Sequence, residues 1–279
     1  MKNRAKDILD PRIIPFFDVN GGFQNFKTHE IGALSQLVSS LVGKNLWEKM
    51  IAIYPFVGQT SARHSYNIKN ILKYKITWNS EFSLTHDKYG VTSTGNSGWG
   101  NTNIPLSIFE NKLNDIHLSA YNRTPLSSAG ADGRLIGVNS LNILTNYSDS
   151  GAQELNFSAN GGIIGYVYSE YNNLGGYGYK ASESSGVSGK GFMIGTNCNK
   201  CYLNGELFGS WQPLLPTEII PICPRKIILF GNRYETSVTS TARVNLAFAS
   251  VGYGLSEQDA KNMNEILETF QKAMRRSVL

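Results

Sequence analysis

The sequence predicts a mainly β protein, in which two antiparallel sheets pack as a sandwich between one short helix near the start and one helix at the end. Between about Lys73 and Val251, short runs rich in β-branched and aromatic residues alternate with clusters of Gly, Asn and Ser. Helical spacing of apolar residues occurs only outside this region, which argues against a βαβ fold. Hydrophobic residues make up 41% of the chain and charged residues 17%, so there is enough apolar material for a core.

Residues 1–30 predict an extended arm. They contain Pro11, Pro15 and the Gly21-Gly22 pair among scattered apolar residues. We therefore expect two parts, an arm for attachment or oligomerisation over 1–30 and a β domain with its flanking helices over 31–279. The apolar groups of the arm also favour a homo-oligomer.

A short amphipathic helix is expected after the arm, with Gly43 placed to end it. Its apolar residues recur at helical spacing. They are Ile31, Leu34, Leu37, Val38, Leu41 and Val42.

The β region divides into short candidate strands. They are 74–78, 115–121, 134–138, 141–145, 154–158, 163–168, 191–196, 200–203, 206–208, 226–230 and 243–251. The sharpest local signal is Asn204-Gly205 between two apolar runs, because this pair suits the two positive φ values of a type I′ hairpin turn. The number of strands without helices between them favours a two-sheet sandwich.

The last helix has a recognisable start. Ser256 and Asp259 form a near capping box, and an apolar stripe follows at a spacing of three to four residues. The stripe consists of Ala260, Met263, Leu267, Phe270 and Met274. We expect this helix to pack back on the sandwich.

Charge and hydropathy indicate which partners and which compartment to expect for the chain. The net charge is +5, but the basic residues are spread along the sequence, so a nucleic-acid partner is not expected. No run approaches the ~18–20 apolar residues that cross a bilayer, and the start lacks a signal-peptide layout. We expect a soluble product made in a cytoplasm. Its cysteines, Cys198, Cys201 and Cys223, are odd in number and are expected to be reduced.

The acidic residues do not form the pair that glycoside hydrolysis requires. Retaining glycosidases need two carboxylates ~5–5.5 Å apart, which alternate positions on one strand can supply. Between residues 50 and 256, no two acids lie closer than five positions in sequence. The sequence therefore predicts no catalytic residues and no enzyme, although acids from different strands could still meet in space.

Metal and cofactor signals are equally weak. Cys198 and Cys201 have the spacing of a zinc site but lack a second pair of ligands nearby, and Asp18 precedes a Gly-Gly turn without the later ligands of a calcium loop. We expect neither a metal nor a cofactor. His117 lies in a strand pattern and is expected to be structural.

Several segments together resemble a known family. They are residues 46–58 (LWEKMIAIYPFVG), 64–69 (HSYNIK), 116–124 (IHLSAYNRT), 202–209 (YLNGELFG), 248–256 (FASVGYGLS) and 264–272 (NEILETFQK). In this order and spacing they resemble bacteriophage structural proteins with a concanavalin-A-like, or laminin-G-like, domain. The resemblance spans about residues 34–275 and implies a jelly-roll sandwich. It also implies a virion protein of the tail, a fibre or the capsid decoration, assembled with other virion proteins and contacting host or mucus polysaccharide.

What remains from the residues is sugar binding without a cofactor, by aromatic rings that stack on sugars and by amides that bind hydroxyls. The candidates lie in loop-like stretches: Trp99, Tyr171, Asn172, Asn173, Tyr177 and Tyr179. The expected function is thus a virion structural protein with a lectin-like domain. The alternatives are a polysaccharide depolymerase on the same fold and an architectural virion protein without a ligand.

Overall fold

The computed structural model describes residues 9–79, 83–94, 98–109, 115–125, 134–139, 152–157, 163–169, 189–196, 200–210, 226–234, 237–239 and 243–279. These residues form two antiparallel sheets with helices at both ends of the chain, so the predicted fold class is confirmed. The predicted strand 141–145 lies outside the described residues.

The larger sheet has eight strands in the order β12-β11-β10-β6-β16-β4-β3, with β1 paired to β16. Every pairing in it is antiparallel. The strands are β1 (Met50–Tyr54), β3 (Leu84–Asp87), β4 (Gly90–Ser93), β6 (His117–Asn122), β10 (Gly191–Thr196), β11 (Lys200–Leu203), β12 (Glu206–Ser210) and β16 (Asn245–Gly252).

The smaller sheet has six strands in the order β2-β5-β13-β7-β8-β9, also antiparallel throughout. They are β2 (Thr77–Asn79), β5 (Trp99–Pro105), β7 (Arg134–Asn139), β8 (Ala152–Phe157), β9 (Ile163–Ser169) and β13 (Lys226–Leu229). A two-stranded ribbon is formed by β14 (Asn232–Tyr234) and β15 (Ser237–Thr239).

Most helical segments lie near the two ends of the chain. They are η2 (Pro11–Ile13), α1 (Ile14–Val19), η3 (Phe23–Asn25), α2 (Thr28–Gly43), η4 (Trp47–Lys49), α3 (Ser61–His64), η6 (Leu106–Phe109) and α4 (Glu257–Ala273). In the described part of the chain, no helix has the length and apolar character to cross a membrane.

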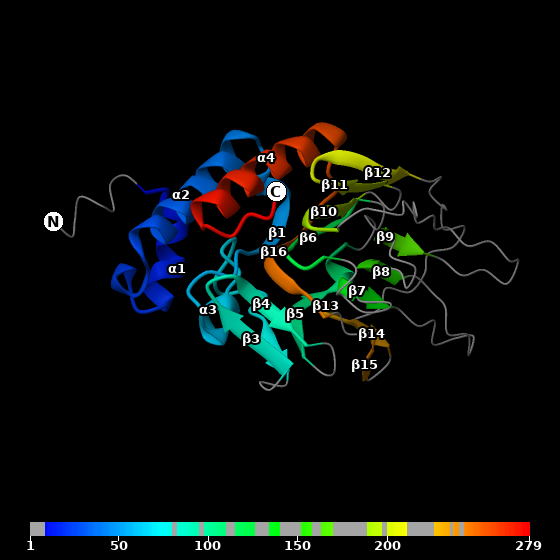
Figure 1. Cartoon of the computed structure of the whole chain (residues 1–279), viewed down its shortest axis with the longest axis horizontal. Helices are drawn as coiled ribbons and strands as arrows, with labels where there is room; N and C mark the ends of the chain where they lie inside the picture. The colour runs from blue at the N-terminus through cyan, green and yellow to red at the C-terminus, as the bar shows by residue number, and fades with distance from the viewer. Residues whose placement is uncertain are drawn as a thin grey trace, which may run out of the picture.

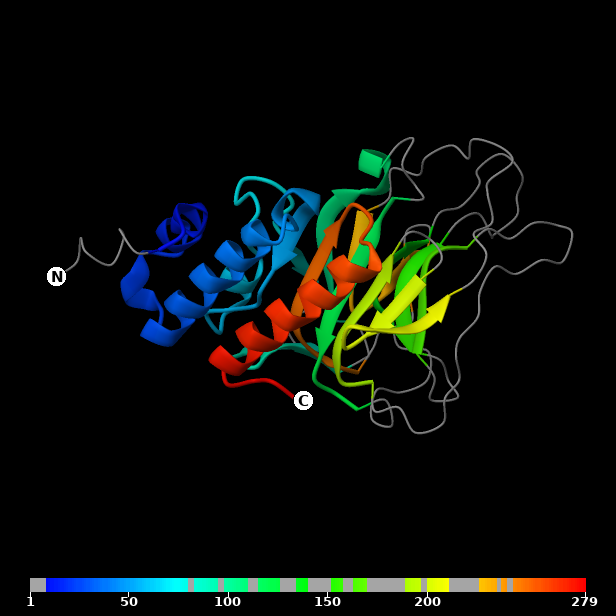
Figure 2. The ribbon, with the colours of Figure 1, turned by 90° about the horizontal axis from the view of Figure 1, so that it is seen from above.

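The elements stack in three layers with two cores. One core fills the space between the sheets and the other lies between the larger sheet and the helices. Figures 1 and 2 show α2 and α4 together on the outer side of the larger sheet, with the smaller sheet on its far side. Every residue of β16 is buried, because Leu246 and Ala249 face the first core while Ala247 and Phe248 face the second.

The local signals of the sequence are realised in the structure. Asn204 and Gly205 have φ values of 52° and 85°, as the predicted hairpin turn requires. The first predicted helix is α2, which begins three residues earlier than expected, at Thr28. The last is α4, whose capping box between Ser256 and Asp259 is formed. Cys201 is a buried free thiol, and burial raises its pKa to about 12, whereas Cys198 and Cys223 lie outside the described residues.

The conformation of the N-terminal segment corrects one expectation. Residues 11–25 were expected to be extended, but they form the helical segments η2, α1 and η3. Pro11 and Pro15 stand in the first turn of η2 and α1, where proline lacks an N–H that would be unpaired anyway. Phe16 and Phe17 are buried in the second core, so the segment packs on the domain. Its expected role in attachment stays a prediction.

Arg276 connects the C-terminal tail to the loop after β1. Its side chain is buried, and its guanidinium donates to the carbonyl oxygens of Pro55 (2.6 Å), Phe56 (2.9 Å) and Ala247 (2.7 Å). Nε donates to Oε1 of Gln271 at 2.6 Å. Burial, with a smaller contribution from the charge of Arg123, lowers the pKa of this group. A buried cation persists only when its donors are paired, and four of the five N–H groups of this guanidinium are.

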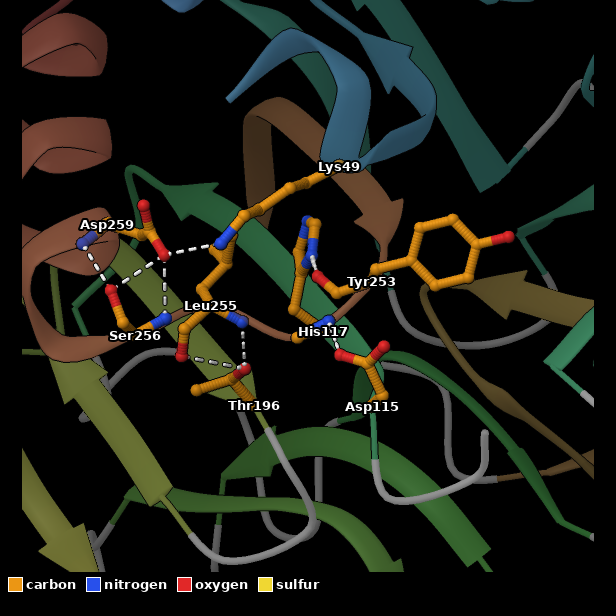
Figure 3. A network of polar contacts seen from close by, with 9 residues as sticks. Lys49, Asp115, His117, Thr196, Tyr253, Leu255, Ser256 and Asp259 are labelled. Atoms are coloured by element: carbon orange, nitrogen blue, oxygen red, sulfur yellow. Dashed lines mark hydrogen bonds and ion pairs between the residues drawn. The ribbon is translucent and has the colours of Figure 1, made fainter. Parts of the chain in front are cut away.

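A polar network fastens the start of α4 to the sheet (Figure 3). Oδ2 of Asp259 accepts from the backbone N–H of Ser256 at 2.8 Å and lies 2.7 Å from Nζ of Lys49. The backbone N–H groups of Gly254 and Leu255 donate to Asp115 (2.9 Å) and Thr196 (2.8 Å). These side chains therefore hold the connection between β16 and α4.

His117 is fully buried in the same network, as the sequence led us to expect of a structural residue. Its Nδ1 donates to the carbonyl oxygen of Tyr253 at 2.6 Å, and Nε2 lies 3.2 Å from Oγ of Ser250. Burial lowers the pKa of His117 from 6.5 to about 4, against the opposing effect of the hydrogen bond to Tyr253. The imidazole is consequently neutral at pH 7.

We expect Arg276→Ala to lower the free energy of unfolding by about 3 kcal/mol or more. The substitution leaves three buried carbonyl oxygens unpaired, and each costs ~1–3 kcal/mol. Urea denaturation of both proteins measures the difference. Arg275→Ala removes an exposed guanidinium next to it and is the matched control, expected within ~0.5 kcal/mol of the unmodified protein. Equal losses in both variants would refute the role of the buried group.

Stability should fall as the pH drops from about 6.5 to about 4. The pKa of His117 in the folded state lies below its value in the unfolded chain. In that pH window the unfolded chain therefore binds the proton and is stabilised relative to the folded protein. A shift of this size corresponds to about 3 kcal/mol. His64 and His86 are shifted in the same direction and add to the fall. Denaturant titrations at intervals from pH 7.5 to 4 measure the free energy of unfolding. In His117→Asn this free energy should depend less steeply on pH, and an unchanged dependence would contradict the role assigned to His117.

Candidate functional site

A hollow opens between α3 with its flanking residues and the strands β2 and β3. Its volume is about 580 Å³, within the range of ~300–1,000 Å³ that is usual for small-molecule sites. It is lined by Gln59, Thr60, Ser61, Ala62, Ser65, Lys75, Ile76, Trp78, Leu84 and His86. We call it the α3–β2 hollow.

The loop leading into the hollow has an unusual backbone. Phe56, Gly58 and Gln59 have φ values of 46°, 102° and 64°, and a positive φ is costly for a bulky residue such as Phe. Arg276 holds this loop by bonding to the carbonyl oxygen of Phe56, and Nη1 of Arg63 bonds to that of Gly58 at 3.0 Å. Backbone strain that is held in place by its surroundings is common at functional sites.

Hydrogen bonds fix the polar wall made by α3. Oγ1 of Thr60 caps the helix by accepting from the backbone N–H of Arg63 at 3.3 Å. The carbonyl oxygen of Ser61 accepts both from Oγ of Ser65 (2.6 Å) and from the indole Nε1 of Trp78 (3.0 Å). Trp78 is thereby held to α3 from the neighbouring strand.

Trp78 itself is half-buried and packs over Gly100 in the next strand. A Cβ at Gly100 would lie 2.5 Å from the indole ring, so glycine is the residue that leaves room for it. The indole meets the His86 ring edge to face, with centroids 4.9 Å apart, and its other ring neighbours are Phe56 and Phe230. These contacts define the orientation of the ring at the wall of the hollow.

Two imidazoles meet behind Trp78. Nδ1 of His64 lies 3.1 Å from Nδ1 of His86, and Nε2 of His64 accepts from the backbone N–H of Gln59 at 3.2 Å. Burial lowers the pKa of both rings, to about 4 for His86 and well below the usual value for His64, so both are neutral at pH 7. Since Nε2 of His64 is an acceptor, its proton must be on Nδ1, which donates to His86.

The tautomer of His86 follows from the same contact. Its Nδ1 accepts from His64, so its proton is on Nε2. His86 lines the α3–β2 hollow and is therefore a fixed N–H donor at this site. Within the described residues, no group of three or more His, Cys, Asp or Glu side chains could hold a metal ion.

Of the candidate residues from the sequence, the structure describes Trp99. Trp99 pairs with Asn79, whereas its neighbour Gly100 pairs with Trp78, so Trp99 lies on the opposite face of the smaller sheet and outside the hollow. Tyr171, Asn172, Asn173, Tyr177 and Tyr179 lie outside the described residues. Their expected role in glycan binding stays a prediction.

Sequence reasoning missed the residues of the hollow. Trp78 fell at the end of a predicted strand, and His64 and His86 are separated by 22 positions, which gives no local pattern. The available signal was the run of glycine and polar residues at 58–61 (GQTS), a composition that is typical of a turn.

Comparison with known proteins shows a shared fold at low identity. No model of a protein family and no curated protein matches the chain. Among solved structures, it is similar to a mutant of Trypanosoma rangeli sialidase displaying trans-sialidase activity, with a TM-score of 0.51 and 9% identity over 86% of this chain and 39% of that chain. A T. rangeli sialidase with 2,3-difluorosialic acid as a covalent intermediate matches with a TM-score of 0.51 and 10% identity, over the same shares.

These matches correct the expectation that the chain is not an enzyme. That expectation rested on the spacing of acids along the sequence, and it is contradicted because the similar solved structures are sialidases. Sequence spacing cannot exclude carboxylates that different strands bring together. The chain spans only 39% of the length of these sialidases, and at this identity the likeness establishes the fold alone.

Proposed function

We propose that the protein binds carbohydrate, and that the α3–β2 hollow is the binding site. The observation that carries the proposal is Trp78, an aromatic ring fixed by a hydrogen bond at the wall of a cavity beside hydroxyl and amide side chains. Sugar rings stack on aromatic faces through their C–H groups, while their hydroxyls need fixed donors and acceptors. Gln59, Thr60 and Ser65 supply such groups around the indole.

Little reorganisation is needed to present these groups. Ser61 is tied to Trp78 and to Ser65, and the loop through Phe56 is tied to Arg276. A site whose side chains are already held in place loses less conformational entropy on binding. This favours recognition of a weakly binding, polar ligand such as a sugar.

We further propose that binding serves a bacteriophage structural protein, in the tail, a fibre or the capsid decoration. This part rests on the resemblance of the segments between residues 34 and 275 to such proteins. In this role the protein assembles as a homo-oligomer with other virion proteins and is located in the virion. The polysaccharide it contacts belongs to the host surface or to mucus.

Trp78→Ala should weaken glycan binding at least about tenfold, because truncating a central aromatic contact usually costs ~2 kcal/mol or more. A glycan array with the purified full-length protein identifies the positive glycans, and calorimetry with each of them measures the dissociation constant. Trp99→Ala is the matched control, since it removes the same side chain from the adjacent strand on the opposite face.

The two variants separate the possible outcomes. Loss in Trp78→Ala alone supports the hollow, whereas loss in Trp99→Ala alone moves the site to the outer face of the smaller sheet. An array without any positive glycan would refute carbohydrate binding. Reducing sugar released from the positive glycans would show that the protein also cleaves what it binds, which is the alternative of a depolymerase.

A further inference from the structure

Within the described residues, the lining of the α3–β2 hollow carries no acidic side chain. Lys75 and His86 are the ionisable side chains among the described residues that line it, and neither is acidic. The ammonium of Lys75 lies 3.2 Å from the hydroxyl of Tyr66 and 4.2 Å from the centre of that ring. Among the described residues, Lys75 forms no ion pair with a carboxylate.

His86 adds a second hydrogen-bond donor, its Nε2–H group, and has no ring nitrogen left to accept a hydrogen bond from a ligand. Its Nδ1 is occupied by His64, which leaves the Nε2–H group as the polar end of the ring. A neutral imidazole in this tautomer can donate to an anion or a hydroxyl but cannot accept from one. The contact between Gln59 and His64 fixes this state from the protein side.

The carboxylate that acts on His86 is Asp87, which raises its pKa against the larger effect of burial. Asp87 is not part of the lining of the hollow. Its Oδ1 accepts from the backbone N–H of Tyr89 at 2.8 Å, in the turn between β3 and β4. Asp87 is thus held by the turn, and its effect on His86 is smaller than that of burial, so the imidazole stays neutral at pH 7.

We infer that the α3–β2 hollow selects an acidic sugar, one that carries a carboxylate, over its neutral counterpart. The carboxylate would pair with the ammonium of Lys75 and accept from Nε2–H of His86. Charge-assisted hydrogen bonds of this type are roughly twice as strong as neutral ones. The inference rests on the proposed function of the same hollow and narrows its ligand class.

The test compares each acidic glycan with its own neutral form. The probes are oligogalacturonate, hyaluronan oligosaccharide and sialyllactose, each with its carboxyl-reduced derivative, measured by calorimetry against the full-length protein. We expect every bound acidic probe to bind at least about tenfold more tightly than its reduced form, and the difference to shrink as salt rises from about 50 to 300 mM because the ion pair is screened.

Lys75→Met should abolish this preference, because it should lower the affinity for each acidic probe to that for its reduced form. Lys73→Met is the matched control, because Lys73 is also exposed and is two residues away but does not line the hollow. If the acidic and reduced forms bind equally, or if both lysine variants lose the preference alike, the inference fails and carbohydrate binding stands. If the protein binds neutral glycans alone, the inference is likewise wrong. If it binds none of the probes and no glycan on the array, both the inference and the proposal of carbohydrate binding are wrong.

Discussion

The buried guanidinium of Arg276 is the constraint on which the rest of the architecture depends. A cation inside a protein is tolerated only where its donors find acceptors. Four N–H groups of this one are bonded to the carbonyl oxygens of residues 55, 56 and 247 and to Gln271. It therefore joins the end of β1, the centre of β16, the helix α4 and the C-terminal tail at one point. The helical layer and the larger sheet cannot shift against each other without leaving a polar group unpaired.

The same interaction reaches the α3–β2 hollow through the backbone. The carbonyl of Phe56 points to Arg276, while the residues that follow turn through positive φ values toward Gln59 and α3. Because the N–H of Gln59 then sets the protonation of His64, and His64 that of His86, the donor at the hollow depends on a contact made by the last few residues of the chain. The buried Arg276 and the imidazole pair at the hollow are therefore linked through the loop 56–59.

The sequence predicted those parts of the fold that local chemistry specifies. The capping box at Ser256 and the Asn204-Gly205 turn carry their structure in a few adjacent residues, so both were found. Strands such as β3, β4 and β5 were missed because their apolar residues are few and only the neighbouring strands give them a register. The two prolines of the N-terminal segment were interpreted as part of an extended arm, although at the first turn proline favours a helix.

The site was harder to predict for a geometric reason. In a strand, a shift of one residue moves every side chain to the other face, so the sequence could not tell whether Trp78 or Trp99 faces the interior until the pairing of β2 with β5 was known. The imidazole pair joins α3 to β3 through space and leaves no trace in the spacing of residues.

The position of β16 has a consequence for how the chain is made. It is the last strand in sequence, yet it pairs with β1, β4 and β6, and all its residues are buried. During synthesis these earlier strands emerge long before their shared partner does. Until residue 252 has left the ribosome, these strands keep unpaired edges and exposed apolar faces. The larger sheet therefore closes only after β16 has been synthesised, and the nascent chain is most exposed to aggregation just before that point.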